Sequence, residues 1–230
     1  MQAGSGGIRY NDSEKYIQLM DENKNWVNWK YFNASLSQLE LVWVSNGSGT
    51  QTFNLPYTGN YVLYSAKHET GNYNFSIEGQ TYYNMMYQFD SYRYAFVNIF
   101  HANAGVTGTF YIGASSYSRH SVLVYIPYQF DSISVITEAK GTVTTPNLTA
   151  EISNSERVLG IMIAASDSTN ATPCSYSLPE VDSTVNTNIQ TNAPYGTSIC
   201  TYTEGFVSSG QFKARTNGTG FAFAGAYRLN

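Results

Sequence analysis

The stretch from residue 81 to residue 94 holds the densest group of side chains that could recognise a ligand. It contains five tyrosines and two methionines, together with an asparagine, a glutamine and an arginine. Tyrosine rings can cover the apolar face of a sugar or a protein, and amide and guanidinium groups can fix its orientation. The candidate ligand-binding residues are Tyr82, Tyr87, Tyr92, Arg93 and Tyr94.

The same stretch also has a purely structural interpretation. Alternation along a strand would place Tyr83, Met85, Tyr87 and Phe89 on one face and Tyr82, Asn84, Met86 and Gln88 on the other. Both faces could then be buried, one in the core and one in a subunit interface. The sequence leaves this alternative open beside the ligand-binding surface.

Motifs for catalysis are missing from the sequence. It has no Gly-x-Ser-x-Gly, His-Glu-x-x-His or Cys-x-x-Cys motif, and no phosphate-binding loop ending in Gly-Lys-Ser/Thr. A glycosidase would need two carboxylates facing each other across a cleft. The candidates Glu69, Glu78, Asp90 and Asp131 each lie near an expected strand end, where acidic residues are common in turns. We therefore expect no catalytic residue and no cofactor.

The three histidines do not have the spacing of a metal site. His68, His101 and His120 are expected at the surface in loops, and no spacing requires them to converge. We expect no metal ligands.

The two cysteines, Cys174 and Cys200, are too few for a disulfide framework. They could pair and close one loop. Two free, partly buried thiols are the other interpretation, which the absence of an export signal favours.

The composition excludes several classes of protein. Of the 230 residues 42% are hydrophobic and only 12% are charged, with 20 Tyr and 12 Phe, so the chain can bury a core and disorder is not expected. With twelve basic and 16 acidic residues, the chain has no excess of positive charge that would attract the phosphates of nucleic acid. No apolar run is long enough to cross a membrane, and the first seven residues lack the pattern of a signal peptide.

Strand signals predict an all-β protein in three segments. Short runs of aromatic and β-branched residues alternate with Asn, Gly, Ser and Asp, and helix signals are nearly absent. Residues 1–34 read as a three-stranded meander for docking or assembly. Residues 35–140 and 141–230 each read as a β-sandwich, or jelly-roll-like, module.

Two short segments suggest that the sandwiches are copies of one type. Residues 105–110 precede a strand at 121–126, and the similar residues 207–212 precede a strand at 221–229. The strands at 60–66 and 157–165 would be the matching early strands. Chance similarity in a chain rich in Gly, Ser and Thr is the alternative.

Three stretches resemble bacteriophage proteins. The opening (Gly7–Asn11, Tyr16–Leu19 and Trp26–Lys30) resembles small structural proteins of tailed phages, in which a β-meander precedes sandwich modules. Phe53–Leu63, with its Pro and Thr-Gly turn, is similar to an early strand pair of jelly rolls in phage fibres and in trimeric ligand-binding proteins. Gly220–Leu229 is similar to the terminal strand of such modules.

This resemblance implies a non-enzymatic virion protein on the particle surface. We expect a tail fibre or tail-tip component that docks through residues 1–34, contacts host-surface polysaccharide and assembles as a homo-oligomer, with a trimer favoured. The alternatives are a capsid decoration protein or head fibre, a bacterial carbohydrate-binding module or lectin, and a glycan-degrading enzyme. Many weak contacts would act together, because linked copies of the chain raise avidity without any new chemistry.

Overall fold

The computed structural model describes most of the chain as β-strands. The described residues are 8–11, 16–20, 26–28, 39–68, 73–77, 82–88, 93–113, 119–143, 148–152, 157–165, 174–177, 185–193, 195–204, 210–216 and 219–230. They contain no helix, which confirms the predicted all-β class. The chain divides into two compact units, residues 1–38 and 39–230.

The first unit is the predicted meander. Strands β1 (Ile8–Asn11), β2 (Tyr16–Met20) and β3 (Trp26–Asn28) form an antiparallel sheet in the order β1-β2-β3. Strands of four, five and three residues give a sheet that is marginal in isolation.

The first sandwich of the second unit comprises β4 to β11. Its five-stranded sheet has the order β4-β11-β6-β9-β8. These strands are β4 (Glu40–Ser45), β11 (Arg119–Ile126), β6 (Gly59–His68), β9 (Arg93–Ala102) and β8 (Tyr82–Gln88). Its three-stranded sheet β5-β10-β7 consists of β5 (Thr50–Asn54), β10 (Thr107–Tyr111) and β7 (Asn74–Ile77). All neighbouring strands are antiparallel.

The second sandwich repeats this topology strand for strand. Its sheets have the orders β12-β19-β14-β17-β16 and β13-β18-β15. These strands are β12 (Ile133–Val143), β13 (Leu148–Ile152), β14 (Val158–Ala165), β15 (Cys174–Ser177), β16 (Val185–Ala193), β17 (Gly196–Glu204), β18 (Gly210–Thr216) and β19 (Thr219–Leu229). Adding eight to each strand number of the first sandwich gives the second. The strands that the sequence suggested as matching, β6 with β14, β10 with β18 and β11 with β19, occupy equivalent positions.

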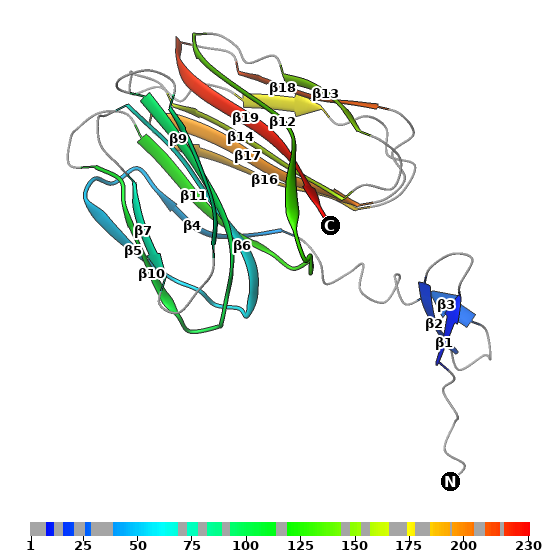
Figure 1. The fold of residues 1–230 in the computed structure, drawn as a ribbon. Helices are drawn as coiled ribbons and strands as arrows, with labels where there is room; N and C mark the ends of the chain where they lie inside the picture. The colour runs from blue at the N-terminus through cyan, green and yellow to red at the C-terminus, as the bar shows by residue number, and fades with distance from the viewer. Residues whose placement is uncertain are drawn as a thin grey trace. The chain divides into compact units, whose positions relative to one another are not determined.

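The four sheets stack as layers, with the two five-stranded sheets in the middle (Figure 1). One hydrophobic cluster, here called the central cluster, joins the facing sides of these sheets. It includes Val62, Tyr64, Val97, Val122 and Val124 from the first sandwich and Ile161, Ile163, Tyr202, Phe223 and Tyr227 from the second. A second cluster fills the first sandwich and includes Phe53, Tyr61, Phe96, Phe100 and Phe110.

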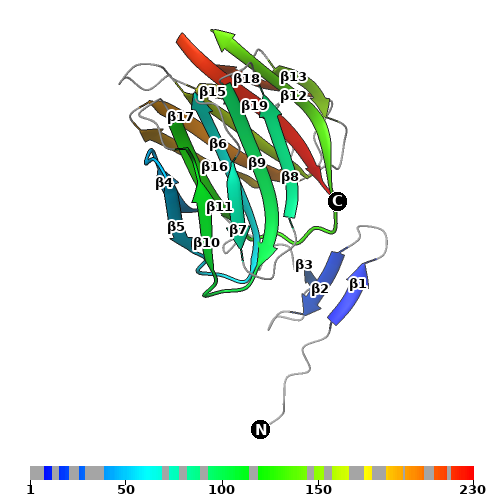
Figure 2. The ribbon, with the colours of Figure 1, turned by 60° about the vertical axis from the view of Figure 1, so that its left-hand side comes forward.

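Strand position explains the sequence patterns. The central strand β14 is buried at all eight positions, so its sequence is nearly continuously apolar. The outer strand β5 has only Phe53 fully buried and alternates with exposed polar residues. The turned view in Figure 2 shows the three-stranded sheet of the first sandwich in front of its five-stranded sheet.

The connection between the sandwiches is fixed at several points. The ring of Tyr128 stacks on that of Tyr202, with centroids 3.8 Å apart. The Asn60 Nδ2 donates a hydrogen bond to the Tyr128 carbonyl, and Arg157 Nη1 donates one to the carbonyl of Gln129. These contacts tie the linker to both sandwiches, consistent with a single compact unit from residue 39 to residue 230.

Some boundaries differ from those expected from the sequence. The structure divides the sandwiches between β11 and β12, whereas turn spacing placed the division at residues 140 and 141, within β12. Strand β12 belongs to the second sandwich because it pairs with β19 along most of its length. Strand β16 lies at the edge of its five-stranded sheet.

Candidate functional site

The structure describes the predicted ligand-binding residues only in part. Tyr82 and Tyr87 lie in β8 and Arg93 begins β9, and the side chains of these three are not described. Tyr92 lies outside the described residues. Tyr94 is half-buried, and its side chain is described.

The register of β8 does not place its two candidate positions on one face. Position 82 pairs with Phe100, which belongs to the cluster inside the first sandwich. Position 87 pairs with Ala95, which belongs to the central cluster. Paired residues share a face, so positions 82 and 87 lie on opposite sides of the sheet.

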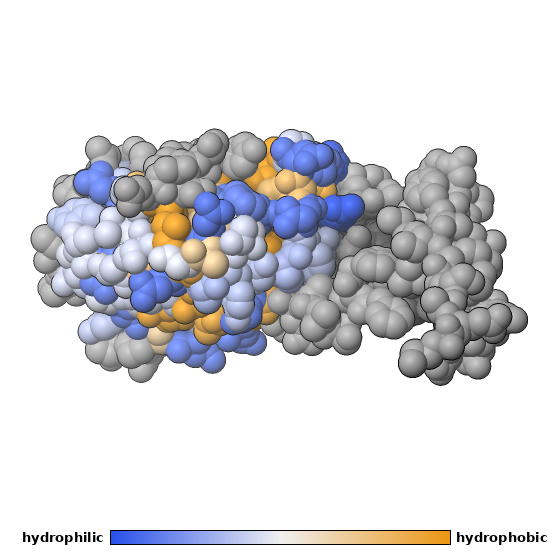
Figure 3. Space-filling view, turned by 90° about the horizontal axis from the view of Figure 1, so that it is seen from below, coloured by the Kyte–Doolittle hydropathy of each residue, from blue (hydrophilic) through white to orange (hydrophobic). Residues whose placement is uncertain are grey.

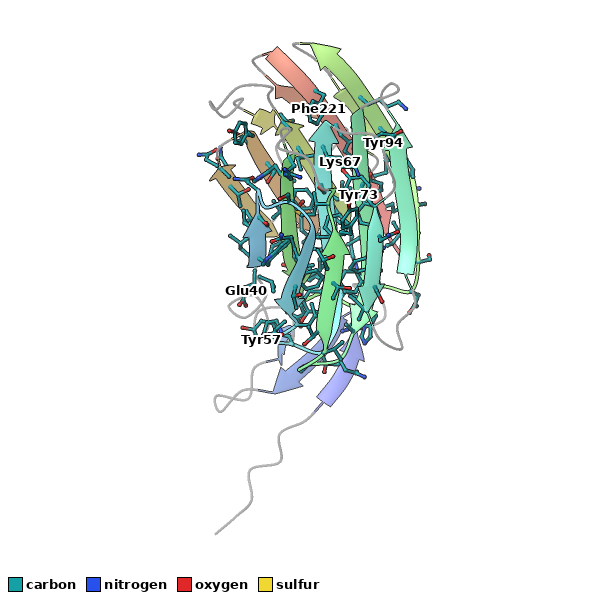
Figure 4. All side chains as sticks on the ribbon, turned by 90° about the vertical axis from the view of Figure 1, so that its left-hand side faces the viewer. Glu40, Tyr57, Lys67, Tyr73, Tyr94 and Phe221 are labelled. Atoms are coloured by element: carbon teal, nitrogen blue, oxygen red, sulfur yellow. The ribbon has the colours of Figure 1, made fainter. Side chains whose placement is uncertain are left out.

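Tyr94 helps to close the interior of the first sandwich. Its backbone carbonyl accepts a hydrogen bond from the hydroxyl of Tyr73, 3.3 Å away. The ammonium of Lys67, a residue only 1% exposed, lies 4.5 Å from the Tyr73 ring centroid and 5.9 Å from that of Tyr94. Burial raises the pKa of Tyr73 far above its usual 10.0. Tyr94 therefore contacts a buried cation–aromatic group (Figure 4).

A different set of aromatic residues reaches the surface at the other end of this sandwich. Four rings, here called the tyrosine ladder, run from the interior outward in the order Phe100, Tyr61, Tyr125 and Tyr57. Successive ring centroids are 5.5, 5.1 and 4.8 Å apart. Phe100 and Tyr61 are buried, Tyr125 is half-buried, and Tyr57 is 39% exposed.

Tyr57 is held at several points although it lies in a connection between strands. The Tyr61 hydroxyl accepts a hydrogen bond from the Tyr57 N–H and donates one to the Tyr57 carbonyl, at 2.9 and 2.6 Å. Burial raises the pKa of Tyr61 to about 12, so this clamp stays protonated. Gly59 has φ +152° and leaves room for Tyr125, whose ring a Cβ there would approach to 2.9 Å.

The outer end of the ladder carries a carboxylate. The Tyr57 hydroxyl donates a hydrogen bond of 2.8 Å to Glu40 Oε1, and both residues are exposed. This hydrogen bond raises the pKa of Tyr57 above its usual 10.0, so the phenol remains a neutral donor. Figure 4 shows Glu40 and Tyr57 close together, well separated from Lys67 and Tyr94.

A buried polar cluster lies between the two five-stranded sheets. His120 Nδ1 is 3.1 Å from Asn46 Oδ1, and His120 Nε2 lies 3.1 Å from Thr191 Oγ1 and 3.0 Å from Ser198 Oγ. Burial lowers the pKa of His120 to about 4, so the imidazole is neutral at pH 7. A Cβ at Gly196 would clash with His120, so glycine permits this close approach of β17 to β11.

The expectation for the histidines was wrong for His120. It lies in β11 and is fully buried, because β11 begins at Arg119 and partners from the second sandwich satisfy the ring. His101 is exposed but lies in β9, where its Nδ1 is 3.1 Å from Asn60 Oδ1. His68 ends β6. His120 and Ser198 form a histidine–hydroxyl pair, but burial closes both to substrate.

Cys200 is a free thiol and is fully buried in the central cluster, so it does not pair with Cys174. Burial raises the pKa of its thiol well above 9.0. We expect Ellman's reagent at pH 8 to leave Cys200 unmodified in the native protein, because neither thiolate nor access is present. Unfolding without reductant should release two reactive thiols. Rapid modification of Cys200 in the native protein, mapped by peptide mass, would contradict this burial.

Few other candidate metal-binding or catalytic side chains lie close together in the described part of the chain. Among them, no three His, Cys, Asp or Glu side chains come close enough to hold a metal ion. Of the acidic candidates Asp131 is described and exposed, whereas Glu69, Glu78 and Asp90 lie outside the described residues. No helix in the described part of the chain is long and apolar enough to span a membrane.

Sequence reasoning missed the exposed end of the tyrosine ladder. Glu40, Tyr57 and Tyr125 are far apart in sequence, and only the pairing of β4 with β11 brings the first and last together. One local signal was present: Tyr57 follows Pro56 and precedes a Thr-Gly turn, which places an aromatic residue in an exposed connection.

Comparisons of this sequence with protein-family models and curated proteins, and of its structure with solved structures, find no significant match.

Proposed function

We propose that this chain is a non-enzymatic structural protein of a bacteriophage particle, namely a tail fibre or tail-tip component that contacts host-surface glycan. The observation that carries the proposal is the division into a small sheet, residues 1–38, and a large body of two sandwiches. A marginal three-stranded sheet is suited to completion by a particle, and a body of stacked sheets is suited to display loops.

The outer sheet of the first sandwich supports contact with an uncharged polar ligand. Strands β5, β7 and β10 contain no charged residue. Their exposed positions are Thr50, Thr52, Asn54, Asn74, Ser76 and Thr107. By contrast, β13 and β18 of the second sandwich carry Glu151, Lys213 and Arg215. Hydroxyl and amide groups without charge suit the hydroxyls of a neutral polysaccharide.

The body also limits how copies of the chain could assemble. The large apolar faces of both five-stranded sheets are already packed against each other in the central cluster. In the view of Figure 3, apolar residues of the described surface form patches interrupted by polar residues. A homotrimer, which we keep as part of the proposal, must therefore use other surfaces, such as sheet edges or the N-terminal meander.

Purified phage particles test the proposal. We expect quantitative mass spectrometry to find the chain in few copies, and antibody labelling to place it on the tail. Replacing Ile17 and Leu19 in β2 with Ser should abolish incorporation because it removes apolar area from the meander. The variant chain should still bind intact host cells as the unmodified chain does.

Other outcomes would identify the alternatives or exclude the proposal. Very many copies on the head would indicate a capsid decoration protein or head fibre. Glycan binding by a chain that is absent from particles would indicate a bacterial carbohydrate-binding module or lectin. Release of soluble sugar from host cell wall by the purified chain would show that it is an enzyme.

A further inference from the structure

We propose that Tyr57, Tyr125 and Glu40 form a binding site for a neutral sugar ring. This inference depends on the glycan contact of the proposed function and names the residues that would make it. The site lies at the exposed end of the tyrosine ladder, where the β5–β6 connection meets the start of β4 and the end of β11.

The Tyr57 side chain is held in place before any ligand binds. An exposed aromatic side chain normally loses rotational freedom when a ligand stacks on it, and this loss weakens binding. Here the Tyr57 backbone is clamped by the Tyr61 hydroxyl, its ring packs 4.8 Å from the Tyr125 centroid, and its own hydroxyl is held by Glu40. The Tyr125 hydroxyl lies 3.4 Å from the Thr58 carbonyl. The ring is therefore already ordered before a ligand arrives.

The carboxylate of Glu40 lies beside the Tyr57 ring and can accept hydrogen bonds from a ligand. A sugar presents C–H groups from one face and hydroxyls around its rim, so it needs an aromatic face next to strong acceptors. Glu40 accepts the Tyr57 hydroxyl through Oε1 and is exposed, so lone pairs of its carboxylate remain open to solvent. A sugar hydroxyl lying over Tyr57 could donate to this carboxylate. The exposed Thr58 lies next to Tyr57 in the same connection.

Aromatic rings beside a carboxylate could also take an organic cation, and the ring arrangement argues against this ligand. A cation is held best between rings that stand apart and enclose it. The rings of Tyr57 and Tyr125 are in mutual contact, at 4.8 Å with an interplanar angle of 42°, and leave no space between them. They present a surface rather than a cage. A negatively charged sugar is disfavoured because Glu40 would repel it.

NMR titration of the full chain with ¹³C-labelled tyrosine tests the site. The probes are neutral hexasaccharides of glucose, galactose and N-acetylglucosamine, with choline chloride as the cationic probe. We expect at least one hexasaccharide to shift the Tyr57 ring signals, and choline to leave them unchanged. Tyr57→Ala should raise the Kd of that saccharide by about tenfold, the loss expected for one aromatic contact. Tyr57→Phe keeps the ring and should stay within about threefold.

Tyr111→Ala is the matched control, because Tyr111 is a half-buried tyrosine on β10 of the same sandwich, away from the ladder. It should bind saccharide like the unmodified chain. Equal binding by Tyr57→Ala, or shifts with choline alone, would overturn this site. Binding to host cells without binding to any of the three saccharides would overturn the assignment to neutral sugars and leave the proposed function standing. Failure to bind host cells would overturn both.

Discussion

Replacing Phe223 with Ala is expected to lower the free energy of unfolding of the 39–230 body by about 3–5 kcal/mol. Phe223 lies in β19 of the second sandwich, is completely buried, and belongs to the central cluster shared with β6, β9 and β11. Its removal leaves a cavity between the two five-stranded sheets. The loss should therefore weaken both sandwiches and not only the one that contains the substitution.

Trp43 provides a probe in the opposite sandwich. It lies in β4, with its ring centroid 5.4 Å from that of Phe53. In a background with Trp26→Phe and Trp29→Phe, Trp43 fluorescence and circular dichroism should follow one urea transition. Phe223→Ala should move both signals together to lower urea. A Trp43 transition that stays in place would show that the sandwiches unfold independently. Val135→Ala is the control, because Val135 is 50% exposed and should change stability by about 0.5 kcal/mol or less.

Acidification from pH 7 to pH 4 is expected to cost the body about 3 kcal/mol through His120 alone. The usual pKa of histidine is 6.5, and burial lowers that of His120 to about 4. Between these values the unfolded chain binds a proton that the folded chain does not. The contribution of neutral His120 to the free energy of unfolding is therefore fully present above pH 6.5 and is lost as the pH falls toward 4. Its hydrogen-bond partners Asn46, Thr191 and Ser198 are uncharged and cannot offset an imidazolium.

Variants at two histidines separate this effect from the titration of carboxylates. His120→Gln keeps a hydrogen-bond donor and an acceptor but does not titrate in this range. In urea unfolding at pH 7, 6, 5 and 4, its free energy of unfolding should fall by about 3 kcal/mol less between pH 7 and pH 4 than that of the unmodified chain. His101→Gln, at an exposed histidine, should keep the dependence of the unmodified chain. Identical pH profiles for His120→Gln and the unmodified chain would show that His120 is not buried in neutral form.

Most strands could be predicted because polar and apolar residues alternate along a strand of a sheet that has one face in solvent. Thr50–Asn54 and Thr107–Tyr111 are examples, with one face polar and the other apolar. Strand β12 is hard to predict because its pairing with β19 shifts register between Val135 and Thr137 and again near Gly141, so that its alternation is broken.

The arrangement of the sandwiches and the sites between strands could not be read in the same way. The unbroken apolar run Val158–Ala165 signals a strand buried on both faces, but it does not say which sheet covers the second face. His120 resembled a loop residue beside Arg119, and its burial depends on Ser198 and Thr191, both distant in sequence. By contrast, alternation along the strand already placed Tyr82 and Tyr87 on opposite faces, and the pairing of β8 with β9 confirms this.

The pairing of the first strand of each sandwich with its last has a consequence for synthesis. Ser45 pairs with Ser121, and Ile133 pairs with Leu229, so neither five-stranded sheet can close until its whole sandwich has left the ribosome. Sheets with such distant pairings fold in milliseconds to seconds, and domains fold from the N-terminus as they emerge. The first sandwich therefore completes early, with its half of the central cluster open to water while the second is still being made. A chain that stops within the second sandwich would keep that face exposed, and it would aggregate or be degraded rather than accumulate as a shorter folded protein.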